Sequence, residues 1–380
     1  MQNIDQEQLL KLTQTIIGFK SISPNEAGCI TYIENYLKNL GMVTIRVDKN
    51  GTSNLIARFG QDKDITFAFA GHIDVVPPGD LSKWKHDPFT LTKNENKLYG
   101  RGIADMKGAV SAFILALETH LKTNPEPNVA LFITSDEEAS SINGTPLIVD
   151  YLKEKQIKIQ YCLLGEPTSV NTLGDVIKIG RRGSLSANLQ INGKQGHVAY
   201  PHLCNNPIHL FAAALAEISS ITWDNGNDHF PPTSLQFTNL HSGIGVNNVI
   251  PGSLITSFNI RYNDLHLADN LKTKITDILN KYNLNYEIEW ENSAKPFITR
   301  NGDLIKIIHS AIFETQQIIP ELKTDGGTSD GRFLIDVVKE LVEFGLNNAT
   351  IHQINENIVE ADLSAISNIY LTILNKIFND

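Results

Sequence analysis

The stretch ITFAFAGHIDVVPPGD, residues 65–80, contains an apolar run that ends abruptly in two polar residues, His72 and Asp74. A continuous apolar run of this length is typical of a strand that is buried on both faces of a sheet. Because side chains two residues apart point to the same face of a strand, we expect His72 and Asp74 to lie together. Burying both costs free energy unless they have partners, and a metal-bound imidazole oriented by a carboxylate is one solution. For these two residues alone, a core histidine satisfied by an aspartate is the commoner explanation.

The segments around this strand alternate between helical and strand patterns up to about residue 180. Amphipathic or apolar helices are expected at 1–20, 29–40, 107–121 and 146–155, and strands at 43–48, 54–60, 65–76, 129–138 and 161–167. Apolar strands between such helices predict an α/β fold, with a mixed sheet flanked by helices. Ligands of such sheets bind beyond the carboxyl ends of the strands. The polar motifs described below all follow or flank predicted strands.

The pattern changes at about residue 183. Strictly alternating strands at 184–193, 233–243, 252–262 and 285–290 are separated by helical patterns at 206–221 and around 271–279. This β-α-β-β-α-β order predicts a ferredoxin-like α+β unit. We therefore predict an inserted domain, 183–295, within a catalytic metal-binding domain formed by 1–182 and 296–380.

Composition excludes several classes of function. The 380-residue chain is 41% hydrophobic and has a formal net charge of −10 without basic clusters, which disfavours nucleic acid or an anionic membrane as partner. No apolar run approaches the roughly 20 residues that span a bilayer. The first residues lack the pattern of a secretion signal, and the three scattered cysteines indicate reduced thiols. We expect a cytoplasmic protein.

Four further motifs place polar residues where the surrounding pattern predicts burial. They are YGRGIADMKG with Asp105, FITSDEEAS with Asp136, Glu137 and Glu138, LLGEPTS with Glu166, and ATIHQINENI with His352. Each has an ordinary explanation: a helix N-cap, a solvated acidic turn, a second turn and a structural histidine. Taken together, a set of histidines and carboxylates at the ends of one sheet suits zinc or a similar divalent ion. Two such ions would share a bridging carboxylate, but the spacing leaves open which carboxylate has which role.

In these motifs the chain resembles the dinuclear zinc aminoacylase and carboxypeptidase family of metallopeptidases. GHIDVVPPGD, GRGIADMKG, TSDEEAS, GEPTS and IHQINE occur in the family's order. The resemblance implies a zinc-exopeptidase-like catalytic domain with an inserted dimerisation domain, and two divalent ions, Zn²⁺ or alternatively Co²⁺. It also implies a cis peptide after the bridging residue. One ion would be held by His72 and Glu166 and the other by Glu138 and His352, with Asp105 bridging, Asp74 orienting His72, and Glu137 as general base.

Later segments imply the substrate. GRRGSL, GHVAYPH, VNNVIPG, FNIRY and TDGGTSDGRF resemble members that remove succinate from N-succinyl-LL-2,6-diaminopimelate. In relatives, a histidine corresponding to His197 reaches the site from the partner subunit, so the resemblance implies a homodimer. The implied substrate-binding residues are Arg181, Ser184, Tyr200, Asn247, Arg261, Gly327, Thr328 and Asn348.

Several alternatives stay open at this point. Either Arg181 or Arg182 could face the substrate, since GRRGS could also be a solvated basic turn, and VNNV could be a tight turn. The loop TDGGTSDGRF could hold an anion or merely connect two elements. A hydrolase of other N-acyl amino acids, such as acetylornithine, and a non-catalytic metal-binding scaffold are the rival functions.

Overall fold

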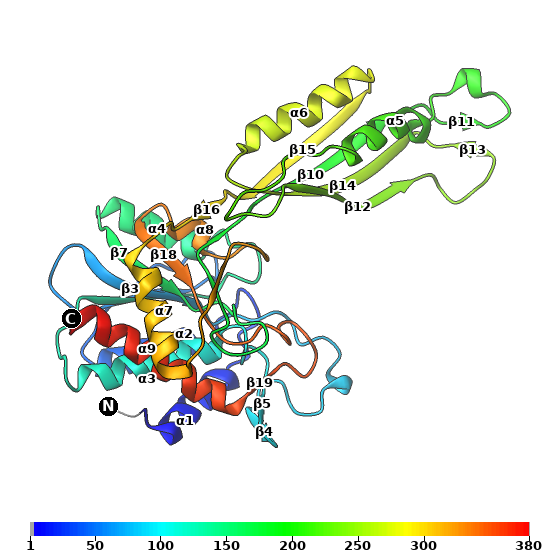
Figure 1. Cartoon of the computed structure of the whole chain (residues 1–380). Helices are drawn as coiled ribbons and strands as arrows, with labels where there is room; N and C mark the ends of the chain where they lie inside the picture. Colours follow the sequence, from blue (N-terminus) through cyan, green and yellow to red (C-terminus); the bar gives the residue numbers. More distant parts are fainter. Residues whose placement is uncertain (1–3, 380) are drawn as a thin grey trace. The chain divides into compact units, whose positions relative to one another are not determined.

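The computed structural model describes residues 4–379, except for the side chains of 292 and 293. The chain forms two compact units (Figure 1). The first consists of Met1–Gly180, Ile298–Lys323 and Ser329–Asp380, and the second of Arg181–Phe297 and Thr324–Thr328. The chain passes between them at β9 (Gly180–Arg181) and β16 (Phe297–Ile298). The predicted boundaries of the inserted domain, 183–295, stay a proposal. The short segment Thr324–Thr328 belongs to the second unit, which the sequence did not indicate.

The first unit is built on an eight-stranded mixed sheet with the order β1-β2-β6-β3-β7-β18-β8-β17. In its centre β6, β3, β7 and β18 run parallel to one another, whereas β2 pairs antiparallel with both β1 and β6, and β18 pairs antiparallel with β8. The strands are β1 (Val43–Arg46), β2 (Asn54–Arg58), β3 (Ile65–His72), β6 (Val129–Thr134), β7 (Ile159–Leu164), β8 (Val176–Lys178), β17 (Glu321–Lys323) and β18 (Val338–Glu343). The predicted α/β class with a mixed sheet is confirmed.

Helices pack against this sheet through apolar side chains. Phe69 of β3 stacks on Phe113 of α3 with 4.2 Å between ring centroids, and Tyr370 of α9 meets both rings edge-on. Nearly every residue of α3 is buried, because α1 and α9 pack against it as well as the sheet. The helices are α1 (Gln6–Gly18), α2 (Cys29–Asn39), α3 (Lys107–Leu121), α4 (Thr145–Glu154), α7 (Asp303–Gln316), α8 (Gly331–Leu334) and α9 (Glu360–Phe378).

The ends of these elements differ from the sequence prediction in a way that matters for the site. The strands predicted at 65–76, 129–138 and 161–167 end at His72, Thr134 and Leu164. The acidic residues of the motifs therefore lie in loops just beyond the strand ends. A small three-stranded sheet of β4 (Thr92–Asn94), β5 (Lys97–Tyr99) and β19 (Asn357–Val359) lies in the same unit. No helix in the range 4–379 has the length and hydropathy needed to cross a membrane.

The second unit has the predicted β-α-β-β-α-β order. Its antiparallel sheet has the strand order β12-β14-β10-β15 and carries α5 and α6. Leu189, Phe211, Phe258 and Ile275 are among the side chains that form its own core. The elements are β10 (Gly183–Asn192), α5 (Pro207–Ser219), β12 (Ser234–Ser242), β14 (Ser253–Tyr262), α6 (Ala268–Lys281) and β15 (Tyr286–Ala294). Beyond one end of β10 and β14, β11 (Gly196–His197) pairs antiparallel with β13 (Val249–Ile250) in a small two-stranded ribbon (Figure 1).

Candidate metal centre

The predicted metal ligands of the first unit come together at the carboxyl ends of its parallel strands. His72 is the last residue of β3, Glu138 follows β6 and Glu166 follows β7. Because β6 and β7 both flank β3 in parallel, their carboxyl ends meet at one edge of the sheet. Asp105 lies just before α3, and His352 lies in the loop between β18 and β19.

Asp105 is the centre of this group. Its Oδ1 lies 3.1 Å from Nε2 of His72, and its Oδ2 lies 3.4 Å from Nε2 of His352. The same nitrogen of His352 is 3.0 Å from Oε1 of Glu138. The two oxygens of one carboxylate thus face two different imidazoles, which is the arrangement that a bridging ligand requires. The Asp105–Met106 peptide bond is cis, as the resemblance implies.

The tautomer of His72 favours a cation at this position. Its Nδ1 donates a hydrogen bond of 2.9 Å to the main-chain carbonyl of Asp74, which leaves Nε2 with a lone pair in the neutral ring. This lone pair faces the carboxylate of Asp105 in a buried place, and the contact is repulsive unless a proton or a metal ion lies between them.

Glu166 completes the set. A ring nitrogen of His72 and one carboxylate oxygen from each of Glu137 and Glu166 lie within 4.8 Å of one another, and the same holds for His72, Asp105 and Glu138. Oε1 of Glu166 is buried and has no hydrogen-bond partner. A buried carboxylate oxygen without a partner is costly, and coordination of a divalent ion would satisfy it. The residues present therefore fit a pair of divalent ions.

The pKa shifts in this group of residues also fit bound divalent ions. Burial alone would lower the pKa of His72, but Asp105 and Asp74 raise it well above the usual value. Asp105 and Glu138 raise the pKa of His352 to about 10. Burial raises the pKa of Glu166 well above the usual range, and the neighbouring Glu137 raises it further. A bound divalent ion would replace the protons that His72 and His352 share with Asp105 and Glu138, and its charge would favour the ionised form of Glu166.

Asp74 makes different contacts from those that the sequence suggested. Its carboxylate lies 3.6 Å from Nδ1 of His72, farther than its own carbonyl oxygen, which accepts the hydrogen bond. The carboxylate instead accepts hydrogen bonds from the main-chain N–H groups of Glu137 and Glu138, both at 3.1 Å, and from the hydroxyl of Ser23. Asp74 thus orients His72 through its main chain and fixes the acidic loop through its side chain.

Glu137 lies in this acidic loop, next to Glu138 but with a different environment. Burial raises the pKa of Glu137 well above the usual range; His72 opposes this effect, and Asp330, Glu138 and Asp105 add to it. A carboxylate with a raised pKa is a stronger base than an exposed one, which suits a group that takes a proton and later returns it.

The predicted substrate-binding residues form two groups within the second unit. Arg181 is buried, and its Nη1 donates a hydrogen bond of 3.2 Å to the carbonyl of Asp325, next to Gly327 and Thr328. Ser184 pairs with Arg261 across β10 and β14. The other group, His197, Tyr200 and Asn247, lies exposed at the β11–β13 ribbon, where the centroids of the His197 and Tyr200 rings are 5.8 Å apart. Asn348, in contrast, belongs to the first unit, where its main-chain N–H donates a hydrogen bond of 2.9 Å to the carbonyl of Ser169.

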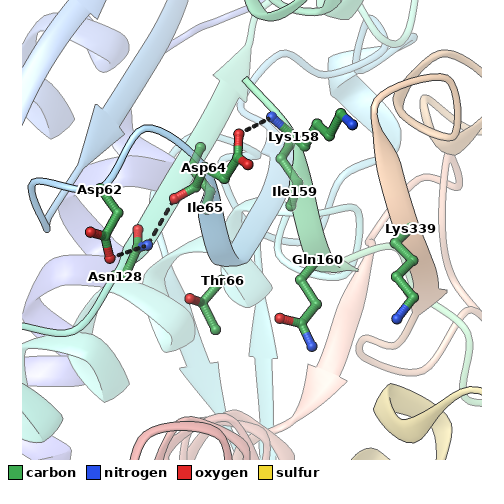
Figure 2. Close-up of a pocket in the computed structure, with 9 residues that line it drawn as sticks. All are labelled: Asp62, Asp64, Ile65, Thr66, Asn128, Lys158, Ile159, Gln160 and Lys339. Atoms are coloured by element: carbon green, nitrogen blue, oxygen red, sulfur yellow. Dashed lines mark hydrogen bonds between the residues drawn. The ribbon is translucent and has the colours of Figure 1, made fainter. Parts of the chain in front are cut away.

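A polar pocket lies at the opposite ends of the same strands (Figure 2). Its lining includes Ile65 and Ile159, which are the first residues of β3 and β7, together with Lys158, Asp64 and Asn128. The main-chain N–H of Lys158 donates to Asp64, as Figure 2 shows. Predicted site residues do not line this pocket, so we place the functional site at the carboxyl ends of the strands.

The comparisons with known proteins identify the class to which this metal centre belongs. Residues 68–376 match the model of peptidase family M20/M25/M40, and the chain belongs to this family. The metallopeptidase family predicted from the motifs is therefore confirmed. Among its relatives, succinyl-diaminopimelate desuccinylase of Azoarcus sp. (strain BH72) is 48% identical over 363 residues, which cover 95% of each chain. The enzyme of the same name from Nitrosospira multiformis is 46% identical over 95% of this chain and 96% of its own.

Solved structures share the fold at lower sequence identity. An M20 family metallo-carboxypeptidase, Sso-CP2 from Sulfolobus solfataricus, superposes with a TM-score of 0.80 at 19% identity, covering 97% of this chain and 98% of its own. YXEP of Bacillus subtilis, described as a dinuclear metal-binding peptidase of family M20, gives 0.68 at 13% identity and covers 98% of both chains.

Proposed function

We propose that this chain is a metal-dependent amide hydrolase that removes succinate from N-succinyl-LL-2,6-diaminopimelate and releases LL-2,6-diaminopimelate. The convergence of His72, Asp105, Glu138, Glu166 and His352 around a common centre is the observation that carries the hydrolytic part. The names of relatives that are 44–48% identical over most of the chain support the substrate.

The ligand assignment follows the contacts at Asp105. We assign His72 and Glu166 to one ion and Glu138 and His352 to the other, with Asp105 between them. Imidazole and carboxylate ligands suit Zn²⁺, with Co²⁺ as the alternative. When bound, two such ions would polarise the amide carbonyl and lower the pKa of a water molecule held between them.

Glu137 performs the proton transfers in this mechanism. Its carboxylate takes a proton from the attacking water and then delivers it to the nitrogen of the leaving amine. Asp74 keeps Glu137 in place because its carboxylate accepts hydrogen bonds from the main-chain N–H groups of Glu137 and Glu138. The imidazole of His197 donates a hydrogen bond to the oxygen that becomes negative when the carbonyl is attacked.

The geometry of the second unit supports a homodimer with shared sites. Ser184 and Arg261 pair near one end of β10, whereas His197 lies beyond the other end of this strand. The eight residue steps from Ser184 to Asn192 along this extended strand span about 26 Å, at roughly 3.3 Å per residue. The substrate, N-succinyl-LL-2,6-diaminopimelate, is shorter than this distance and cannot contact both groups of one chain. We therefore propose that His197, Tyr200 and Asn247 serve the site of the partner subunit, while Arg181, Ser184 and Arg261 bind the substrate carboxylates in their own.

The reaction can be tested directly. The purified full-length chain, reconstituted with Zn²⁺ or Co²⁺, is expected to release a free amine from N-succinyl-LL-2,6-diaminopimelate with a kcat/KM far above that for acetylornithine. Faster hydrolysis of acetylornithine would overturn the substrate assignment. Metal binding without hydrolysis of either compound would overturn the enzymatic assignment and favour a scaffold. We propose that the enzyme acts in the cytoplasm, as expected for a biosynthetic enzyme like its relatives.

A further inference from the structure

A buried ion pair lies behind the metal centre and involves none of the residues considered so far. Nη1 of Arg101 is 2.8 Å from Oε2 of Glu356, and neither side chain is more than 2% exposed. The two residues are 255 positions apart in the sequence. Because both charges are desolvated, such a pair is by itself weak evidence for stability. Its other contacts are more informative.

Glu356 fixes the main chain of the segment that ends in Asp105. Its Oε1 accepts hydrogen bonds from the N–H groups of Ala104 at 2.9 Å and of Asp105 at 3.2 Å. Its Oε2 accepts from the N–H of Gly102 at 3.0 Å in addition to the guanidinium. Four donors thus converge on one carboxylate. They hold the loop whose last residue presents a carboxylate to both histidines of the centre.

Arg101 contacts the main chain of the other ligand segment. Its Nη2 faces the carbonyl oxygen of His352 at 3.4 Å. His352 has a φ of 60°, in the left-handed region that a residue with a side chain seldom occupies. The ring of Trp84 lies 5.2 Å from the guanidinium carbon and covers it. An unfavourable backbone conformation at a ligand is therefore held in place from behind by a buried cation.

We propose that Arg101 and Glu356 are a positioning pair that aligns the Asp105 and His352 ligands, which come from distant parts of the chain, before the ions bind. This inference rests on the proposed metal centre, but it does not depend on the identity of the substrate. The pair contacts no predicted substrate-binding residue, so its loss acts on metal affinity and on kcat and leaves KM almost unchanged.

The test uses the full-length chain after chelation and measures Zn²⁺ binding by calorimetry and the d–d absorption of bound Co²⁺. Glu356→Gln preserves the shape of the side chain but removes one acceptor and the charge. We expect its affinity for at least one of the two ions to fall about 10–100-fold, with an altered Co²⁺ spectrum. The control is Tyr370→Phe, which removes another buried hydrogen bond, from the tyrosine hydroxyl to the carbonyl of Phe344, in neither the Asp105 nor the His352 segment.

The outcomes separate positioning from a merely structural role. If Glu356→Gln and Tyr370→Phe both lower the unfolding midpoint while both bind two ions as the wild type does, the proposal is wrong. If Glu356→Gln does not fold, Arg101→Lys, which keeps the charge but not the second contact, is read by the same two measurements. Failure of the wild type to hydrolyse N-succinyl-LL-2,6-diaminopimelate would overturn the proposed function without affecting this result, because metal binding needs no substrate.

Discussion

Replacing Glu137 with glutamine is expected to abolish turnover and at the same time to stabilise the metal-free protein. The two effects have one cause, the burial of a carboxylate beside Asp105, Glu138 and Asp330. Removal of a general acid–base group costs about 10²–10⁴ in rate, which corresponds to roughly 3–5 kcal/mol of activation free energy. Metal content should be unchanged, because Glu137 is not one of the proposed ligands.

The effect on stability follows from the sign of the pKa shift. Burial raises the pKa of Glu137 in the folded chain above its unfolded value, so ionisation opposes folding. Wild-type stability is full below the unfolded pKa and falls as the pH rises through the folded pKa. Each unit of difference costs about 1.4 kcal/mol at a pH above both values. Glutamine cannot ionise, so the free energy of unfolding of the variant should exceed that of the wild type at pH 7 and approach it at pH 4.

Denaturant unfolding of chelated protein at both pH values, metal analysis and kcat at saturating substrate measure these quantities. Glu154→Gln is the matched control, because Glu154 is exposed on α4 and pairs with the neighbouring Lys155 at the surface, and it should leave all three quantities unchanged. A Glu137→Gln variant that binds both ions and keeps kcat within tenfold of the wild type would refute the assignment of the base.

Three further predictions concern the second unit. Mixing the inactive His197→Ala variant with the inactive Glu137→Gln variant should restore about a quarter of wild-type activity after subunit exchange. Half of the dimers would then be mixed, and one of the two sites in each mixed dimer would be intact. The absence of any recovery would exclude shared sites. The hydrogen bonds of Asp224 lower its pKa to about 2, so the stability that it contributes is present above pH 4 and lost between pH 4 and 2; Asp224→Asn should flatten the acid limb of the midpoint of thermal unfolding against pH. A Cβ added at Gly196 would lie 2.2 Å from the sulfur of Cys204, so Gly196→Ala should reduce kcat by displacing the β11–β13 ribbon, and Cys204→Ala should partly restore kcat in the double variant.

The sequence predicted the elements of the molecule well because hydrophobic periodicity determines them. The parallel strands read as unbroken apolar runs, and the ligands were found because polar residues at the ends of such runs contradict the surrounding pattern. The helix at 107–121 has the same bounds in the structure. The strands end earlier than predicted, since the polar ligand residues form loops and not ladder pairs.

What the sequence could not supply is the direction of each polar contact. The shared face of His72 and Asp74 suggested a bond between their side chains, but the carbonyl of Asp74 lies closer to the ring. Its carboxylate turns to the N–H groups of a loop 63 residues away. Arg101 and Glu356 gave no signal either, because a lone arginine beside glycine and a lone glutamate in NEN have the appearance of surface residues until the fold buries them.

The position of β18 between β7 and β8 has a consequence for how the protein is made. This strand spans Val338–Glu343, so the ribosome must finish the entire second unit and more before the central sheet can close. Until then β7 presents an unpaired edge, and the nascent chain lacks His352, the second of the two histidines in the candidate metal centre. A divalent ion that needs all five candidate ligands can therefore bind only after synthesis has passed His352, so a complete metal centre forms late in the making of the chain.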